Sequence, residues 1–302
     1  MSGERWEREL VEKLLLETLR EQQRQRRWNL FFRILFLLSL VAIFIAAILR
    51  QPLLPIGKHV AQIRLEGVIT GDAPLNADRF IQALQKIEKG DATGLLLRLN
   101  SPGGSPVQAD RIYRAILRFK ERKGIRVVAV VEEICTSGCY YVAAAADEIY
   151  TNPTSVVGSL GVVASGFGFV GLIQKLGIER RLWTAGEHKA MLDPFLPVRP
   201  EHRKQLEKIL RETHAVFIEA VKRGRGDRLK DDPIVFSGMI FSARQGLALG
   251  LIDGFGTPKE ISRRLFGTDK IVDYTPKEEL FEKLARGLGT ALANTFLDLR
   301  LR

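Results

Sequence analysis

The sequence predicts an α/β domain with a mainly parallel sheet, preceded by one N-terminal transmembrane helix. Apolar runs rich in β-branched residues alternate with amphipathic stretches of helical periodicity, and only short turns separate them. Continuous apolar runs of this kind are typical of strands that are buried on both faces. Nearer the N-terminus, an apolar run with a single charge is long enough to span a bilayer as one helix.

Composition and charge indicate which kinds of molecule the protein is expected to bind. The chain has 302 residues, of which 46% are hydrophobic and 27% charged, as expected of a globular protein. The net charge of +11 is spread along the chain, and no nucleic-acid-binding motif accompanies it, so we expect no nucleic-acid partner. An anionic membrane surface is the favoured partner of these cations.

Composition changes divide the chain into five segments. We expect a charged amphipathic helix over 1–29, the transmembrane helix over 30–49, a linker over 50–58, the main domain over 59–275 and a helical tail over 276–302. Arginines crowd the N-terminal side of the span, which predicts a cytoplasmic N-terminus, insertion in the inner (cytoplasmic) membrane and an exported main domain. A cleaved signal peptide is the rival interpretation, and the absence of a convincing small-residue cleavage site argues against it.

The main domain is expected to repeat the order strand, turn, helix. Strands are predicted over 59–68, 94–99, 127–131, 149–150 and 178–184, and a glycine-punctuated extended segment over 155–163. Helices are predicted over 77–89, 110–123, 169–176, 201–223, 243–249 and 259–265. Such units form right-handed crossovers, and sites in open α/β sheets lie at the carboxyl ends of the strands.

The stretch VVAVVEEICTSGCYYVAAAAD, residues 127–147, places a serine at one of these strand-to-helix turns. Ser137 follows the apolar strand, and an alanine-rich helical composition follows Ser137. A helix that begins here aims its N-terminal amides at negative charge near the hydroxyl. Serine also caps helices without any catalytic role, so the stretch alone leaves both interpretations open.

Two further segments could complete a catalytic site. The four histidines form no recognisable Ser-His-Asp pattern, but a lysine can replace histidine when burial keeps the amine neutral. Lys189, in the proline-interrupted loop 187–200, has apolar neighbours and is our candidate base, although most lysines are simply solvated. Gly103 and Gly104 could supply amides to an oxyanion, or could form an ordinary tight turn.

Cys135 and Cys139 flank the serine at a spacing that matches no common metal pattern. We therefore expect no metal and no cofactor, and interpret the pair as two small apolar side chains packed beneath the turn. A local disulfide, or a thiol nucleophile at Cys139, are the alternatives.

Five motifs in order carry a resemblance to a known family. They are LRLNSPGGS, EEICTSGCYYVAAAAD, VVGSLGVV, EHKAMLDPF and FSARQGLALGLIDGFG, and they lie behind one apolar span. Together they resemble the signal peptide peptidase A family of membrane-bound serine peptidases, over about residues 59–265. The resemblance implies a Clp/crotonase-like fold of stacked ββα units and catalysis by a Ser/Lys dyad.

The resemblance also assigns roles to residues. It makes Ser137 the nucleophile, Lys189 the general base, and Ser159 the side chain that helps to hold the lysine. It places Gly104 at the oxyanion, with Gly103 beside it and Gly138 assisting. The chain departs from the family pattern at Cys139, where glycine is common, and at Cys135. Extended substrate is expected to pair with an edge strand at 156–164, and the substrate-binding residues predicted there are Val157, Gly158, Leu160 and Gly161.

Assembly and substrate follow from the same resemblance. It implies a homo-oligomeric ring in which serine and lysine come from adjacent subunits, acting on residual signal peptides and other hydrophobic or unfolded segments. A closed ring requires a heterologous interface. Two other functions remain as alternatives: a crotonase-type acyl-CoA enzyme, and a non-catalytic membrane scaffold.

Overall fold

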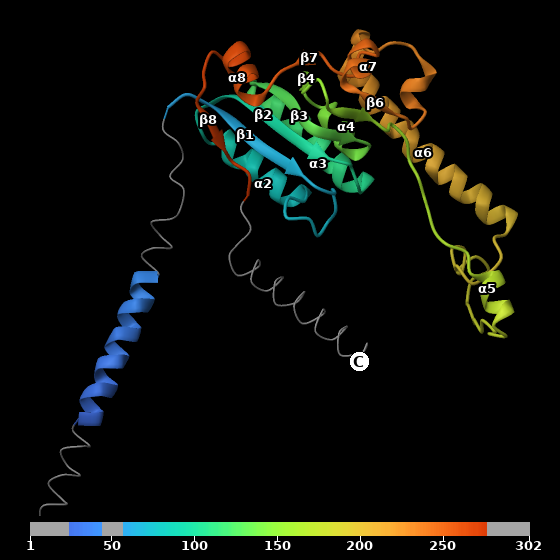
Figure 1. The fold of residues 1–302 in the computed structure, drawn as a ribbon, viewed down its shortest axis with the longest axis horizontal. Coiled ribbons are helices and arrows are strands. Elements are labelled where there is room, and N and C mark those ends of the chain that lie inside the picture. Colours follow the sequence, from blue (N-terminus) through green and yellow to red (C-terminus); the bar gives the residue numbers. More distant parts are fainter. Residues whose placement is uncertain (1–23, 44–56, 277–302) are drawn as a thin grey trace, which may run out of the picture. The chain divides into compact units, whose positions relative to one another are not determined.

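The computed structural model describes residues 24–43 and 57–276, in two units that divide after Pro55. The first unit contributes a helix over residues 24–43, and the second contains the sheet (Figure 1). No helix in these two ranges is both long and apolar enough to cross a membrane. The predicted span over 30–49 runs on into residues 44–49, outside the described residues, and stays a prediction. Most of the predicted helices over 1–29 and 276–302 also lies outside them.

The second unit is a mixed α/β domain built on one eight-stranded sheet. Its strands are β1 (His59–Glu66), β2 (Ala92–Ser101), β3 (Arg126–Thr136), β4 (Glu148–Thr151), β5 (Val156–Gly158), β6 (Ile240–Ser242), β7 (Gly254–Phe255) and β8 (Ile271–Asp273). They run in the order β6-β5-β3-β2-β1-β8, with β4 paired to β3 and β7 paired to β4. All pairs are parallel except β5 with β6, which confirms the predicted mainly parallel sheet.

Strand β3 is longer than the apolar run predicted and branches the sheet. Its first half pairs with β4 over Val128–Val131, and its last three residues, Ile134 to Thr136, pair with β5. A register shift relative to β2 separates the two halves. The carboxyl end of β3 therefore lies between β2 and β5, and the turn that follows it opens at the junction of three strands.

Helices pack against both faces of the sheet. The helices of the second unit are α2 (Ala77–Glu88), α3 (Pro106–Lys123), α4 (Gly138–Ala143), α5 (Val170–Lys175), α6 (Pro200–Arg225), α7 (Ala243–Ala248) and α8 (Pro258–Phe266), with short 3₁₀ turns at Gly226–Arg228 and Pro233–Phe236. Leu95, Leu97 and Leu99 pack in the large core with α2, α3 and α4. Leu96 points to the other face, where it packs in a smaller cluster with Ile261 of α8. Burial on both faces explains why β2 has three consecutive leucines, Leu95 to Leu97.

Residues 159–199 leave the sheet as an arm that carries α5, and the chain returns to the sheet along the long helix α6 (Figure 1). The predicted strand over 178–184 is wrong, because this segment has no strand partner and Trp183 is 85% exposed. β propensity reflects packing on a pleated surface, and the arm offers no such surface here. The short strands β6, β7 and β8 were not predicted, because two or three residues are too few to show a period.

Candidate active site

Ser137 occupies a strained turn between β3 and α4. Its backbone has φ 52° and ψ −125°, a conformation that costs a non-glycine residue about 1–3 kcal/mol. Two backbone hydrogen bonds hold it: Ser137 N donates to Gly158 O at 2.9 Å, and Tyr141 N donates to Ser137 O at 3.0 Å. Strain that the surrounding structure maintains in this way is typical of functional sites.

The segment containing Gly103 and Gly104 packs against this turn without room for side chains. A Cβ atom added to Gly103 would lie 2.8 Å from Gly138 N, and one added to Gly138 would lie 3.4 Å from Gly104 N. Gly104 forms a parallel bridge with Ile69, using Gly103 O and Ser105 N at 2.8 and 2.7 Å. In such a bridge the amide of the central residue points away from its partner, so Gly104 N–H faces away from Ile69.

The backbone amides of Gly103, Gly104 and Gly138 are not equivalent as donors to an oxyanion. Gly103 N donates to Ser101 Oγ at 3.1 Å and is therefore already engaged. Gly138 is the first residue of α4, so its amide has no partner within the helix. Gly104 and Gly138 both line the same cavity as Ser137, whereas Gly103 supports the turn from behind. The pair of amides that can face an oxyanion beside Ser137 is thus Gly104 and Gly138.

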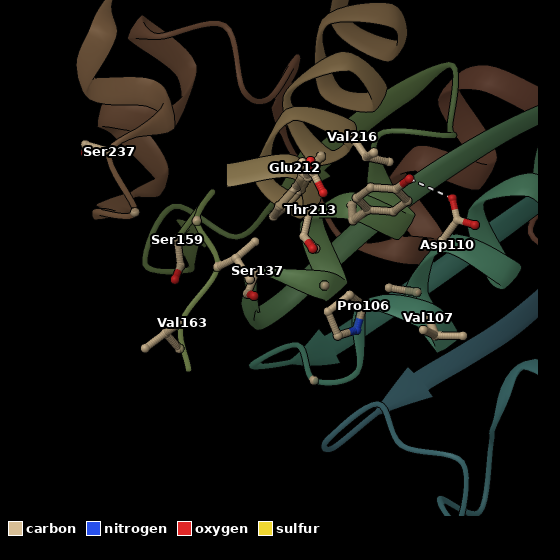
Figure 2. Close-up of a pocket in the computed structure, with 18 residues that line it drawn as sticks. Pro106, Val107, Asp110, Ser137, Ser159, Val163, Glu212, Thr213, Val216 and Ser237 are labelled. Carbon is tan, nitrogen blue, oxygen red and sulfur yellow. Dashed lines mark hydrogen bonds between the residues drawn. The ribbon is translucent and has the colours of Figure 1, made fainter. Parts of the chain in front are cut away.

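The cavity beside Ser137 has a volume of about 790 Å³ and is largely apolar (Figure 2). Its lining is Gly104, Pro106, Val107, Ala109, Asp110, Ser137, Gly138, Tyr141, Ser159, Gly161, Val162, Val163, Glu212, Thr213, Val216, Phe217, Ser237 and Gly238. The Tyr141 hydroxyl donates to Asp110 Oδ1 at 2.8 Å. Burial and this hydrogen bond raise the pKa of Tyr141, so its phenol stays protonated at neutral pH and does not act as a base.

Ser159 lies on the opposite side of Ser137 from Asp110 (Figure 2) and shares its unusual backbone. Its φ is 53°, and in the part of the chain that the structure describes only Ser137 and Ser159 are non-glycine residues with positive φ. Ser159 N donates to Met239 O at 2.7 Å, which ties the start of the arm to the segment before β6. Both serines therefore lie in the same cavity and at backbone positions that the fold must hold in place.

Lys189 does not line this cavity within one chain. It lies in the turn between α5 and α6, where its amide donates to Gly186 O at 3.1 Å, and its side chain is exposed. This turn belongs to the arm, well away from α4 (Figure 1). One chain thus brings together Ser137, Ser159 and the two glycine amides, and leaves Lys189 outside.

Only part of the predicted substrate-binding segment is accessible from the cavity. Val157 and Leu160 are fully buried in the core, and the Cβ position of Gly158 is blocked by Phe241. β5 is not an edge strand, because it pairs with β3 on one side and β6 on the other. Of the four predicted residues, Gly161 alone lines the cavity, so any free edge begins after β5.

Cys135 and Cys139 form a disulfide, with their Cα atoms 5.1 Å apart. The expectation of two packed free thiols is therefore wrong, although both residues are fully buried as expected. Spacing by itself could not decide this, because the bond depends on the bend between β3 and α4 that brings the side chains together. A thiol nucleophile at Cys139 is excluded while the bond is intact.

Several cavity residues were not anticipated from the sequence. Thr213, Val216 and Phe217 come from α6, whose sequence indicates only an amphipathic helix, and Tyr141 lies one turn beyond the serine.

Within residues 24–43 and 57–276, no group of three His, Cys, Asp or Glu side chains is arranged to hold a metal ion.

The comparisons with known proteins include a family match and several named relatives. The model of peptidase family S49 matches residues 119–271, which include β3, the Ser137 turn and the arm. The chain is 38% identical over 238 residues to a Brucella abortus protein named "Na(+)/H(+) antiporter NhaA", which covers 76% of this chain and 32% of that protein. The chain therefore spans about a third of the length of that relative.

Two other relatives are named as peptidases. "Putative protease MJ0651" of Methanocaldococcus jannaschii is 32% identical over 67% of this chain and 67% of its own length. "Putative signal peptide peptidase SppA" of Enterococcus faecium is 28% identical over 72% of this chain and 66% of its own length. On the family match and these relatives, the chain belongs to peptidase family S49.

Proposed function

We propose that this protein is a membrane-anchored serine endopeptidase that uses a Ser137/Lys189 dyad. The observation that carries the proposal is the strained Ser137 beside the amides of Gly104 and Gly138 in one apolar cavity. Ser137 Oγ attacks the carbonyl carbon of a peptide bond and passes its proton to the lysine amine. The two amides stabilise the oxyanion, the lysine returns the proton to the leaving amine, and water then hydrolyses the acyl-enzyme.

The lysine of each site comes from a second copy of the chain. Lys189 is remote from its own Ser137, and the arm that carries it exposes large apolar side chains over much of its length. Phe167, Trp183 and Leu192 are examples, and an unpartnered apolar surface of this kind favours association. When the arm of one subunit packs against the next, Lys189 reaches the neighbouring cavity, where Ser159 holds its amine. A head-to-tail contact of this kind closes into a homo-oligomeric ring.

The substrates are unfolded or hydrophobic peptides, with residual signal peptides as the natural class. Apolar side chains from α3, α4 and α6 line the cavity, which suits apolar substrate residues. A peptide in extended conformation can pair with the backbone after β5, at 159–163. The printed name of the Enterococcus faecium relative supports this substrate class.

The membrane is the second partner, and the main domain lies on its exported side. In the first unit every residue of the helix over 24–43 is exposed, including the apolar side chains from Leu30 to Val41, with Arg33 as the charge among them. A helix that is apolar on all sides is suited to lipid contact. The Cys135–Cys139 disulfide fits an oxidising, extracytoplasmic compartment.

An active-site serine probe tests the proposed nucleophile. We expect the wild-type chain to be labelled and to cleave a fluorogenic peptide, and Ser137→Ala to lose the labelling and about 10⁴-fold or more of kcat. Ser165→Ala is the matched control, because Ser165 is exposed and does not line the cavity, and it should keep both signals. Labelling that persists in folded Ser137→Ala would show that another residue is the nucleophile. A wild-type chain without labelling or cleavage would favour a scaffold.

A further inference from the structure

The disulfide encloses the proposed nucleophile in a small covalent ring. Cys135 lies two residues before Ser137 and Cys139 two residues after it, so the bond spans only Thr136, Ser137 and Gly138. The ring therefore contains the strained serine and the amide of Gly138, two of the groups that must act together on a peptide carbonyl.

Each end of the ring is anchored in a different element. Cys135 pairs with Ser101 of β2 and with Val157 of β5, so its backbone is fixed in the sheet. Cys139 is the second residue of α4, and its side chain is fully buried. The bond thus ties the first turn of α4 to the branch point of the sheet.

Other restraints also act on this turn. On the α4 side Tyr141 N donates to Ser137 O at 3.0 Å, and two hydrogen bonds act on the β3 side. Ser137 N donates to Gly158 O, and Thr136 Oγ1 donates to Pro102 O at 3.1 Å. Both hold the approach from β3, whereas the bond to Cys139 also restrains the position of Gly138 relative to Ser137. Non-glycine residues rarely adopt the φ of Ser137, so the turn would relax if these restraints were weakened.

The short span of the bond argues for a local role. A disulfide stabilises a fold mainly by reducing the freedom of the unfolded chain, and this effect is smallest for short loops. A bond between residues four positions apart therefore contributes less to global stability by this route than a bond that closes a long loop. Its effect is concentrated in the turn that it closes.

We propose that the Cys135–Cys139 disulfide is a positioning element for catalysis, which fixes Ser137 and the Gly138 amide relative to each other. Turnover therefore depends on the oxidised state of the two cysteines. The proposal rests on the peptidase function proposed above. A dithiol reductant breaks the S–S bond and supplies two electrons and two protons, which yields two cysteine thiols and the oxidised, cyclic disulfide of the reductant. The peptidase is consequently weak in a reducing compartment and reaches full turnover where the bond forms.

The test compares full-length protein in its oxidised and reduced states. Because both cysteines are buried, the reduced state is prepared by refolding with dithiothreitol, and thiol counting should give none and two free thiols for the two states. We expect reduction to lower kcat on a fluorogenic peptide by about 10–100-fold with KM within about twofold, as a small misplacement of reacting groups would. Reoxidation should restore kcat. A purely structural role would instead lower the Tm and the active fraction without changing the kcat of the folded protein.

The variant Cys135→Ala/Cys139→Ala keeps the proposal falsifiable if the reduced protein refolds poorly. It should match the reduced wild type in kcat and show no response to dithiothreitol, with unchanged circular dichroism and oligomeric state. Equal kcat in oxidised wild type, reduced wild type and this variant would overturn the positioning role and leave the peptidase function intact. An oxidised wild type that cleaves no peptide would overturn the peptidase function, and this proposal with it.

Discussion

Mixing Ser137→Ala subunits with Lys189→Ala subunits is expected to restore peptide hydrolysis that neither variant shows alone. Each variant should lose about 10⁴-fold or more of kcat, because the nucleophile and its base act as one unit. Lys189 lies on the exposed arm and does not line the cavity of its own chain. A site that joins Ser137 of one subunit to Lys189 of the next can be intact in a mixed assembly even though every subunit is defective.

The size of the restored activity distinguishes this arrangement from others. If subunits mix at random in equal amounts, about a quarter of the interfaces combine an intact serine with an intact lysine. Denaturing and refolding the two variants together, and measuring hydrolysis of a fluorogenic peptide, should therefore give about a quarter of wild-type kcat. The double variant Ser137→Ala/Lys189→Ala mixed with wild type is the control for subunit exchange. No activity in the complementing mixture, although subunits exchange, would place both residues of the dyad in one chain.

Asp253→Asn is expected to destabilise the domain by about 3–5 kcal/mol, because it removes the partner of a buried cation. Arg225, at the end of α6, is 1% exposed. Its Nη1 and Nη2 donate to the two carboxylate oxygens of Asp253 at 2.7 and 3.0 Å, and its Nε donates to Gly250 O at 2.8 Å. Asp253 Oδ2 also accepts from Ile149 N at 2.8 Å, so one carboxylate joins α6 to β4.

The stability that the Asp253 carboxylate contributes is expected to decrease at low pH. Burial alone would raise the pKa of Asp253, but hydrogen bonds from Arg225 and the Ile149 amide outweigh it and lower the pKa. The carboxylate therefore contributes stability above the unfolded value of about 3.9, and this contribution is lost as the pH falls through the lower folded pKa.

Urea unfolding at pH 7 and at steps down to pH 3 measures the difference between wild type and Asp253→Asn. The difference should be largest at pH 7 and should narrow below about pH 4. Asp269→Asn is the matched control, because Asp269 pairs with Arg263 on the surface, and it should change stability by at most about 1 kcal/mol. A gap for Asp253→Asn as small as that of the control would show that the buried pair does not stabilise the fold.

Local patterns predicted the main elements of the domain because each depends on nearby residues. The apolar run 127–131 lies within β3, and the periodic stretch 77–89 matches α2 to within one residue. The pattern failed at 178–184, where apolar and β-branched residues lie exposed on the arm. Such a segment has strand composition, but a strand also needs a hydrogen-bonding neighbour, which sequence composition does not provide.

The candidate active site also has features that the sequence predicts and features that it does not. Local composition was enough to place Ser137 between a buried strand and a helix and to show the two glycines at 103 and 104. Four features became visible only in the folded domain: Gly103 N donates to Ser101 Oγ, the two cysteines are bonded, α6 lines the cavity, and Lys189 does not line the cavity that contains Ser137. The cavity wall formed by α6 and the position of Lys189 depend on long-range contacts, which are set by how β3, the arm and α6 pack. The Gly103 hydrogen bond and the disulfide join residues two and four positions apart, but they depend on bends of the backbone that composition does not specify.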